Sequence, residues 1–374
     1  MQGYDSAEPN TTFKEEKGRN WYKRFITFQK RNIDIMMNWQ GLKKYRGKMA
    51  IDRFGRRIEY LRISLTDHCN LRCLYCMPED MIFRPNADLM QDDEILYFAR
   101  LFADLGFNKI RLTGGEPTVR ANVVEIVRSI AAIFGIETVT MTTNGVQLPR
   151  LAEPLARAGL KRVNISLDSL DPNNFKQLTR WGDMEDVWEG IMAAEAAGLT
   201  PIKINAVVVG GYNEDEVVDL ARLTITHPWQ VRFIEMMPLG GVTDFQLSQV
   251  ITADQILAKM VSTFGGLEKI NNGKLDGEAR LYRLPGAKGE LGFISSVSNP
   301  FCSACNRARL TADGILRMCL LRDLEVDLLN PLRTGAGQEE LRRLILSAIW
   351  DKPWGHGLAD GVVSSGRVMS QIGG

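Results

Sequence analysis

The sequence lacks any run of eighteen or more apolar residues, and its first residues lack the uncharged apolar core of a secretory signal. We therefore expect neither a membrane-spanning helix nor export, and predict a cytoplasmic protein that does not act at a membrane. Charge of one sign is also lacking, because the 374 residues have a formal net charge of +1. Residues 1–48 hold 11 basic and 5 acidic side chains, so the rest of the chain is slightly acidic. Such a body is not expected to bind nucleic acid.

Cysteine is scarce, and three of the six cysteines fall within "DHCNLRCLYC" at residues 67–76. In a reducing compartment, closely spaced thiols are metal ligands or nucleophiles rather than disulfide partners. Cys69, Cys73 and Cys76 have C-x3-C-x2-C spacing. A structural zinc site needs four ligands, whereas three thiolates hold three irons of a [4Fe-4S] cluster and leave the fourth iron open. His68 would have to fold back sharply to serve as a fourth ligand, so we predict a cluster with a vacant coordination site.

A second set of three cysteines lies near the C-terminal end, in "FCSACNRARLTADGILRMC" at residues 301–319. Cys302, Cys305 and Cys319 have C-x2-C-x13-C spacing, and no histidine or fourth cysteine lies nearby. The count again fits a cluster with one open iron. By spacing alone, a zinc ribbon that lacks one ligand remains an alternative.

The middle of the chain alternates short β-branched runs with amphipathic helical segments, which predicts six strand-then-helix units. Repeated units of this kind imply parallel strands, and six of them form a partial (β/α)6 TIM-type barrel of the α/β class. In the segment "DDEILYFARLFADLG", Ile95, Phe98 and Phe102 share one face, and Asp92 or Asp93 is expected to cap the helix. The predicted strands cover residues 60–66, 109–114, 138–143, 162–167, 202–209 and 231–237.

Three regions follow from this pattern and from the change of composition near residue 265. Residues 1–48 are predicted to be a poorly ordered N-terminal extension, unless Met49 is the real start of the protein. Residues 49–265 hold the barrel, and residues 266–374 form a C-terminal extension with the second cysteine set. Polar residues recur after the predicted strands, at 113–117, 142–145, 166–168 and 235–238, and are expected to surround one pocket at the carboxyl ends of the strands.

The combination of C-x3-C-x2-C after the first strand and "GGEP" at residues 114–117 after the second resembles the radical S-adenosylmethionine superfamily. From about residue 52 onward the chain also resembles the GTP 3′,8-cyclase family, MoaA. The motifs that carry this second resemblance are "LRISLTDHCNLRCLYCMPE", "KIRLTGGEP", "TTNG", "VNISLDSL", "RFIEMMPLG", "FCSACNRARLTADG" and the terminal "IGG".

The resemblance implies an enzyme with two [4Fe-4S] clusters and S-adenosyl-L-methionine. A 5′-deoxyadenosyl radical would remove hydrogen from the 3′ carbon of GTP, and the product would be (8S)-3′,8-cyclo-7,8-dihydroguanosine 5′-triphosphate, at the first step of molybdenum cofactor synthesis. The implied partners are GTP, a downstream cyclic pyranopterin monophosphate synthase and a low-potential electron donor of flavodoxin or ferredoxin type. A homodimer is a further expectation.

The resemblance also assigns roles to individual residues. The two cysteine sets would bind the clusters. The expected contacts of S-adenosylmethionine are Tyr75, Gly115, Ser166 and Met237. The expected contacts of GTP are Arg62, Lys109, Arg111, Thr142, Lys203, Arg232, Arg307, Ala308 and Arg309. The expected catalytic residues are Arg62, Arg307, Arg309, Gly373 and Gly374, because the tail is expected to enter the barrel near a pocket arginine.

Simple electrostatics agrees with a polyanionic ligand. Arg62, Arg111, Lys203 and Arg232 lie on strands predicted to enclose one space, where inward-facing cations are costly without an anion. Arginine also suits bidentate contacts with phosphate.

Two other functions compete with this interpretation. One is a peptide-modifying radical enzyme with an auxiliary cluster, although such extensions usually have more cysteines. The other is a non-catalytic zinc protein that binds nucleic acid through its basic N-terminal segment. Metal analysis separates the second from the rest, because it contains zinc rather than iron and sulfide.

Overall fold

The computed structural model describes residues 50–240, 249–273, 275–358, 364 and 366–373. The predicted extension at residues 1–48 lies outside these residues, as does Gly374. In the described part of the chain, no helix combines the length and apolar character needed to cross a bilayer.

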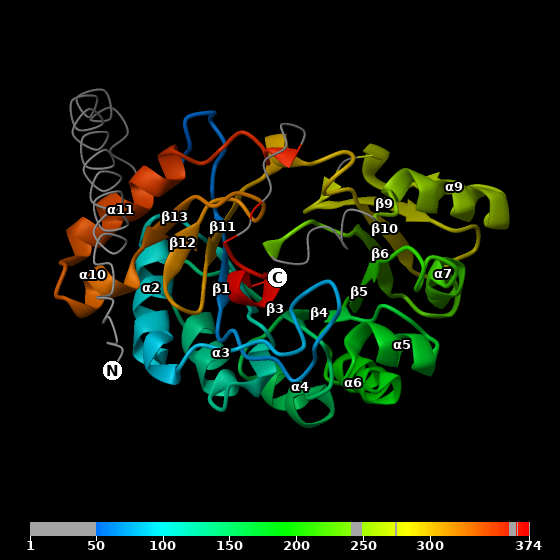
Figure 1. Cartoon of the computed structure of the whole chain (residues 1–374), viewed down its shortest axis with the longest axis horizontal. Helices are drawn as coiled ribbons and strands as arrows, with labels where there is room; N and C mark the ends of the chain where they lie inside the picture. The colour runs from blue at the N-terminus through cyan, green and yellow to red at the C-terminus, as the bar shows by residue number, and fades with distance from the viewer. Residues whose placement is uncertain (1–49, 241–248, 274, 359–363, 365, 374) are drawn as a thin grey trace, which may run out of the picture. The chain divides into compact units, whose positions relative to one another are not determined.

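Six parallel strands, each followed by at least one helix, run in order from β1 to β6 across the centre of the sheet (Figure 1). They are β1 (Tyr60–Ser64), β2 (Lys109–Thr113), β3 (Thr138–Thr143), β4 (Arg162–Ser166), β5 (Lys203–Val208) and β6 (Gln230–Glu235). The intervening helices are α2 (Asp92–Asp104), α3 (Val123–Ala131), α4 (Leu148–Arg157), α5 (Pro172–Thr179), α6 (Met184–Ala196), α7 (Val217–Thr226) and α9 (Ala253–Phe264). The predicted partial (β/α)6 arrangement is confirmed, and every predicted strand is present to within two residues of its start and end.

The C-terminal segment extends this sheet at both edges. Strand β10 (Glu290–Ile294) pairs in parallel with β6, while β11 (Arg307–Leu310) pairs in parallel with β1. The outer strands are β7 (Glu268–Lys269), β8 (Leu275–Asp276), β9 (Ala279–Arg283), β12 (Ile315–Arg317) and β13 (Glu325–Asp327). The last helices are α10 (Leu329–Arg333), α11 (Gln338–Trp350) and α12 (Met369–Ile372). One continuous sheet therefore crosses residue 265, and the domain division there stays a prediction.

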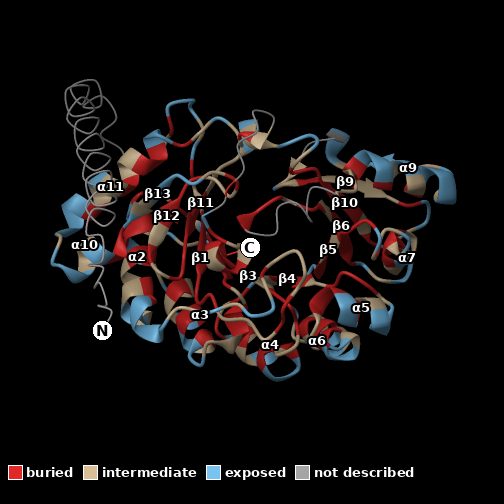
Figure 2. Cartoon of the chain, in the orientation of Figure 1, coloured by how far each residue is buried: buried red, intermediate tan, exposed pale blue. Residues whose placement is uncertain are grey.

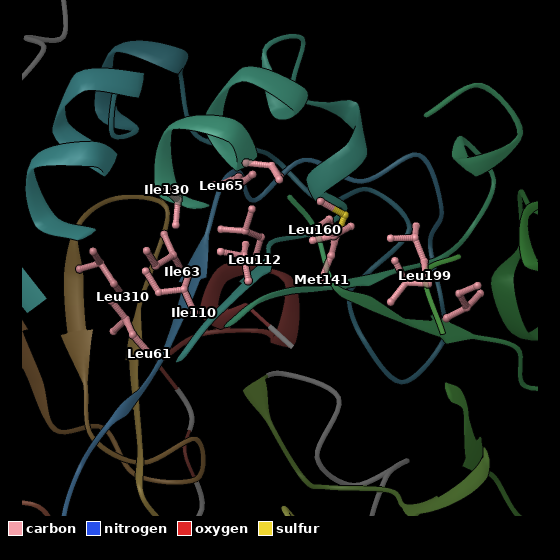
Figure 3. Close-up of a cluster of buried hydrophobic side chains, with 14 of the residues drawn as sticks. Leu61, Ile63, Leu65, Ile110, Leu112, Ile130, Met141, Leu160, Leu199 and Leu310 are labelled. Carbon is pink, nitrogen blue, oxygen red and sulfur yellow. The ribbon is translucent and has the colours of Figure 1, made fainter. Parts of the chain in front are cut away.

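The six central strands have an apolar outer face and a polar inner face. On β1, Leu61 and Ile63 are fully buried, whereas the side chain of Arg62, between them, lies on the opposite face. Outward side chains of the same kind from β2, β3 and β11 pack against the helices (Figure 3). The buried residues accordingly follow the strands and the inward faces of the helices, while the outer helical faces are exposed (Figure 2).

The N-terminal cap of α2 differs from the prediction. Gln91, rather than Asp92 or Asp93, occupies the cap position, and its backbone N–H donates to the Glu94 carboxylate at 2.7 Å. Asp92 and Asp93 lie in the first turn, where their negative charges interact favourably with the positive end of the helix dipole. The free backbone N–H of Gln91 is thus satisfied by the carboxylate of Glu94, three residues later, rather than by a side chain at the cap position.

Helix α6 approaches the loop after β3 so closely that one position admits only glycine. A Cβ atom on Gly190 would lie 2.2 Å from the carbonyl oxygen of Gly145. Gly145 itself has a φ of 88°, so its backbone cannot easily shift to another conformation. This contact holds the "TTNG" loop against the helix layer.

We therefore predict that Gly190→Ala lowers the free energy of unfolding by about 1–3 kcal/mol through overpacking. The measurement is a urea unfolding curve of the variant and of the unaltered protein. Glu189→Ala is the matched control, because Glu189 is exposed on the same helix and its loss should change stability by less than about 0.5 kcal/mol. Equal midpoints for Gly190→Ala and the unaltered protein would contradict the close packing.

Candidate active site

One pocket is lined by all six cysteines, although the two sets lie more than 200 positions apart in the sequence. None of the six forms a disulfide bond. The same pocket is lined by eight of the residues expected to contact S-adenosylmethionine or GTP, which are Arg62, Tyr75, Gly115, Thr142, Ser166, Met237, Arg307 and Arg309. The fold thus brings most of the predicted site residues together.

The first cysteine set lies on the loop that follows β1. The loop is fixed to the end of α5, because the backbone N–H of Arg72 donates to Thr179 O and that of Leu74 donates to Leu178 O. Burial raises the pKa of Cys69 to about 11 and that of Cys76 to about 12. Thiolates at these positions therefore need a positively charged partner, and iron ions of a cluster supply one.

The "GGEP" turn is built against this cysteine loop. The N–H of Gly115 donates to Thr66 O at 2.7 Å, and the N–H of Glu116 donates to His68 O at 2.8 Å. A Cβ on Gly115 would lie 2.4 Å from two carbonyl oxygens of the loop, and a Cβ on Gly114 would lie 2.5 Å from Thr66 O. Two glycines are therefore required for the turn to touch the loop, and the pocket wall is formed by backbone rather than by side chains.

Glu116 joins the loops that follow β2 and β3. Its buried carboxylate accepts hydrogen bonds from the Thr143 hydroxyl at 2.7 Å and the Asn144 N–H at 2.6 Å. Burial raises the pKa of this carboxyl, while four hydrogen bonds partly compensate. The polar segments predicted after these two strands do meet, with Glu116 as the structural link between them.

The structure shows where the side chains of Tyr75 and His68 lie, which the sequence did not determine. The Tyr75 hydroxyl donates to Asp168 at 2.6 Å, so the ring is fixed in the pocket wall between two cysteines. Burial raises the pKa of Asp168 to about 6 despite hydrogen bonds from Tyr75 and the Val207 N–H. His68 instead stacks on Phe83, with ring centroids 4.6 Å apart, and its Nε2 lies 3.3 Å from Arg84 O. His68 therefore lies among residues 83 and 84 and is absent from the pocket wall.

The second cysteine set is surrounded by positive charge. The Arg56 guanidinium donates to Cys302 O at 2.7 Å and to Pro353 O at 2.7 Å, which fixes the two loops together. The buried Lys352 ammonium donates to Arg307 O at 2.8 Å. Burial alone would raise the pKa of Cys305, but Lys352 and Arg307 outweigh it and lower that pKa to about 7. The site thus favours a thiolate at Cys305.

The cysteine geometry also bears on the zinc alternative. Within the described ranges, no three histidine, cysteine or acidic residues converge as ligands of one metal ion. Ligands of an iron–sulfur cluster bind different irons and need not converge on one point. Two sets of three thiols on one pocket are compatible with two clusters, of which the second stays a prediction.

A group of arginines lies beside the second cysteine set. In the sheet register, Arg62 on β1 stands between Arg111 on β2 and Arg309 on β11. Burial, followed by repulsion from neighbouring charges, lowers the pKa of Arg309 well below its ordinary value, and burial lowers that of Arg62 to about 10. The buried Nε of Arg62 has no hydrogen-bond partner. These buried cations therefore provide a site for an anion.

The remaining residues predicted to bind GTP lie farther along the strands. Arg111 donates to Tyr60 and Thr142, while Lys203 and Arg232 lie buried on β5 and β6. Lys109 is exposed at the start of β2, and Ala308 is buried in the hydrophobic core on the outer face of β11. The pocket wall includes none of these five residues, which are Lys109, Arg111, Lys203, Arg232 and Ala308.

The C-terminal tail enters the same region. Helix α12 lies on the inner side of the strands (Figure 1), and the Gly373 carbonyl accepts hydrogen bonds from Thr113 Oγ1 at 3.1 Å and Arg309 Nη1 at 3.2 Å. Gly373 has a φ of 83°, and a Cβ there would lie 2.6 Å from Thr113 Oγ1. The expected tail-to-arginine contact is thus made by a backbone carbonyl, and Gly374 lies outside the described residues.

Several pocket residues were missed by the sequence reasoning. Asn164 and Asn205, on β4 and β5, line the pocket with buried amide oxygens that lack a partner. Alternation would have found them, because "RVNIS" and "KINAV" place a polar residue at every second position of a buried strand. Arg56 and Lys352 carried no comparable signal, since isolated cations are common on surfaces.

Comparison with known proteins places the chain in a family. Residues 63–224 match the Radical SAM superfamily, and residues 229–358 match Molybdenum Cofactor Synthesis C. The GTP 3′,8-cyclase of Peptoclostridium acidaminophilum is 47% identical over 328 residues, which cover 87% of this chain and 98% of that protein. The GTP 3′,8-cyclase of Moorella thermoacetica is 48% identical over 324 residues, covering 86% and 99%.

Among solved structures, Streptococcus suis SuiB bound to S-adenosylmethionine shares the fold, with a TM-score of 0.56 at 16% identity over 93% of this chain and 78% of that one. Membership of the radical S-adenosylmethionine superfamily implies a [4Fe-4S] cluster and S-adenosylmethionine. The chain, matched over nearly the whole length of its curated relatives, belongs to the GTP 3′,8-cyclase family of radical S-adenosylmethionine enzymes, which act at the first step of molybdenum cofactor synthesis.

Proposed function

We propose that this chain converts GTP into (8S)-3′,8-cyclo-7,8-dihydroguanosine 5′-triphosphate. The observation that carries the proposal is the single pocket that joins two sets of three thiols to a group of buried arginines. A radical reaction on a nucleotide needs these three parts within reach of one substrate.

At one end of the pocket, Cys69, Cys73 and Cys76 would hold the [4Fe-4S] cluster. Gly115, with its backbone against the cysteine loop, and Ser166 at the end of β4 would contact S-adenosylmethionine, together with Tyr75 and Met237. When bound, the cluster and S-adenosylmethionine supply a 5′-deoxyadenosyl radical for hydrogen abstraction. The two glycines of the "GGEP" turn let it lie directly against the cysteine loop, because a Cβ at either position would collide with loop carbonyls.

Near the arginine group, Cys302, Cys305 and Cys319 would hold a second cluster, which would provide an anchor for the guanine. The low pKa of Cys305 favours the thiolate needed for this role. Arg62, Arg307 and Arg309 would bind the charged part of GTP, supported by Arg111, Lys203 and Arg232. Asn164 and Asn205 would supply partners for ribose hydroxyls, since their amide oxygens are otherwise unsatisfied.

The proposal includes two partners outside the chain. The reaction needs an electron, for which a low-potential donor of flavodoxin or ferredoxin type is suited. The product would pass to cyclic pyranopterin monophosphate synthase. The barrel at residues 49–265 would carry the radical chemistry, and residues 266–374 would carry the second cluster.

The first test is anaerobic reconstitution followed by incubation with S-adenosylmethionine, dithionite and GTP. We expect 5′-deoxyadenosine and cyclised nucleotide whose formation depends on GTP. Cys76→Ser should abolish both products, because two remaining thiols leave an unstable cluster. Formation of 5′-deoxyadenosine at the same rate without GTP, and with no nucleotide product, would refute the proposed substrate.

The second test addresses the other cysteine set. We expect Cys305→Ser to retain reductive cleavage of S-adenosylmethionine in part but to lose the cyclised nucleotide, because the guanine would no longer be anchored. Iron content should fall by about half while the first cluster remains. A variant that still forms cyclised product at the normal rate would show that this set is structural.

The third test addresses the tail. Gly373→Ala should leave iron content unchanged and cut cyclised product by about tenfold or more, because the added Cβ would collide with Thr113 Oγ1 and displace the carbonyl from Arg309. Product formation and iron should be measured in one preparation, with Gly337→Ala as control, since a Cβ at Gly337 meets no atom within 4 Å. Normal turnover in Gly373→Ala would exclude a catalytic tail.

A further inference from the structure

A small acidic hairpin projects into the cation group. Strands β8 and β9 pair with Asp276 opposite Ala279, so Gly277 and Glu278 form the turn between them. Gly277 has a φ of 65°, which suits such a tight turn. Asp276 and Glu278 thus flank the tip of the hairpin, and neither was singled out from the sequence.

Each carboxylate pairs with cations that would bind the phosphates of GTP. Asp276 Oδ2 lies 2.7 Å from Lys203 Nζ and 2.9 Å from Arg232 Nη2. Glu278 Oε2 lies 3.5 Å from Arg307 Nη1. The hairpin therefore occupies the positions of an anionic ligand.

The charge state of the hairpin agrees with this geometry. Burial would raise the pKa of Glu278, but Arg307, Arg232, Arg111 and Arg62 outweigh it and hold that pKa far below its ordinary value. Both hairpin carboxylates are thus ionised at neutral pH. Together the two carboxylates offset only part of the positive charge of the surrounding cations. Burial and the neighbouring Arg232 still lower the pKa of Lys203 to about 8.

Exposure distinguishes the ion pairs of Asp276 from ordinary structural ones, whereas the Glu278 side chain is 18% exposed and is linked to the cations by charge and distance alone. The Lys203 and Arg232 side chains are 6% and 4% exposed and are fixed in central strands, whereas the Asp276 side chain is 42% exposed at a hairpin tip. Moving Asp276 into water costs little, but leaving both cations without an anion is costly. Gly292 supports the fixed position of Arg232, because a Cβ at Gly292 would lie 2.9 Å from Arg232 Cγ.

We propose that Asp276 and Glu278 are displaceable counter-anions, which neutralise the phosphate-binding cations until the triphosphate of the substrate replaces them. This inference rests on the proposed function. The hairpin would thereby affect the affinity of the protein for nucleotides and its selectivity for the number of phosphate groups they carry. A nucleoside with no phosphate gains nothing from displacing the hairpin, whereas a triphosphate does.

The test measures nucleotide affinity of the reconstituted protein at fixed ionic strength. Asp276→Asn keeps the shape of the side chain and removes its charge, so GTP should bind roughly fivefold tighter while guanosine affinity stays unchanged. Inorganic tripolyphosphate should compete with GTP more strongly in the variant. The melting temperature without nucleotide should fall, and the rise on adding GTP should be larger. Glu278→Gln should behave in the same way, and serves as the second variant where Asp276→Asn does not fold.

Asp313→Asn is the matched control. Asp313 pairs with Arg367 at 2.9 Å, with side chains 13% and 9% exposed, and its ion pairs within the described part of the chain, with Arg84 and Arg367, involve none of the cations that face the hairpin. Its loss should lower the melting temperature without changing GTP affinity. Failure of the unaltered protein to bind GTP would refute the proposed function itself. Normal binding by the unaltered protein, with unchanged or weaker binding in both hairpin variants, would overturn this inference alone.

Discussion

The cost of burying cations is the constraint on which this structure depends. Alternation along each strand places apolar side chains against the helices and leaves Arg62, Arg111, Lys203 and Arg232 on the opposite, inner face. An apolar lining would make a more stable barrel, since buried charge is poorly compensated even when paired. The hairpin carboxylates and the hydroxyls of Tyr60 and Thr142 offset part of this cost, and they leave the Nε of Arg62 unsatisfied. Within the described residues, the positive charge of these buried side chains is therefore only partly compensated. A phosphate chain would supply the missing negative charge.

Sheet continuity determines which cations act together. The parallel pairing of β11 with β1 sets Arg309 beside Arg62, although 247 positions separate them in sequence. The pairing of β10 with β6 similarly sets Gly292 beside Arg232, where the missing side chain leaves space for the aliphatic stem of the arginine. The pairing of β11 with β1 also determines the position of Cys305, because Cys305 lies two residues before the start of β11. Cys305 is therefore positioned by the backbone hydrogen bonds of a strand, while the Arg56 guanidinium holds the loop of Cys302.

Local patterns in the sequence were sufficient for the six central strands and for the meeting of their polar ends, because each unit follows from β-branched runs and helical periodicity. The pairing of β10 and β11 with the barrel edges was beyond such reasoning, since it depends on contacts between distant segments. The cap of α2 was misassigned because the free backbone donor is satisfied by Glu94 and not by a side chain at the cap. Asp276 and Glu278 were overlooked because a stretch rich in glycine, asparagine and lysine has the composition of a linker. Motif resemblance identified the arginines but gave no information about what neutralises them.

The tail and the hairpin suggest how such a pocket discriminates among anions. Arg309 donates to the Gly373 carbonyl, a neutral dipole, while Lys203 and Arg232 face a single half-exposed carboxylate. The carbonyl is uncharged and the carboxylate carries one negative charge, so a phosphate group would compete with either of them. An anion with one charged group would displace one partner and leave other cations paired as before. A triphosphate would replace several at once, so under the proposed role of the hairpin selectivity for three phosphates would come from competition within the chain as well as from attraction by the arginines.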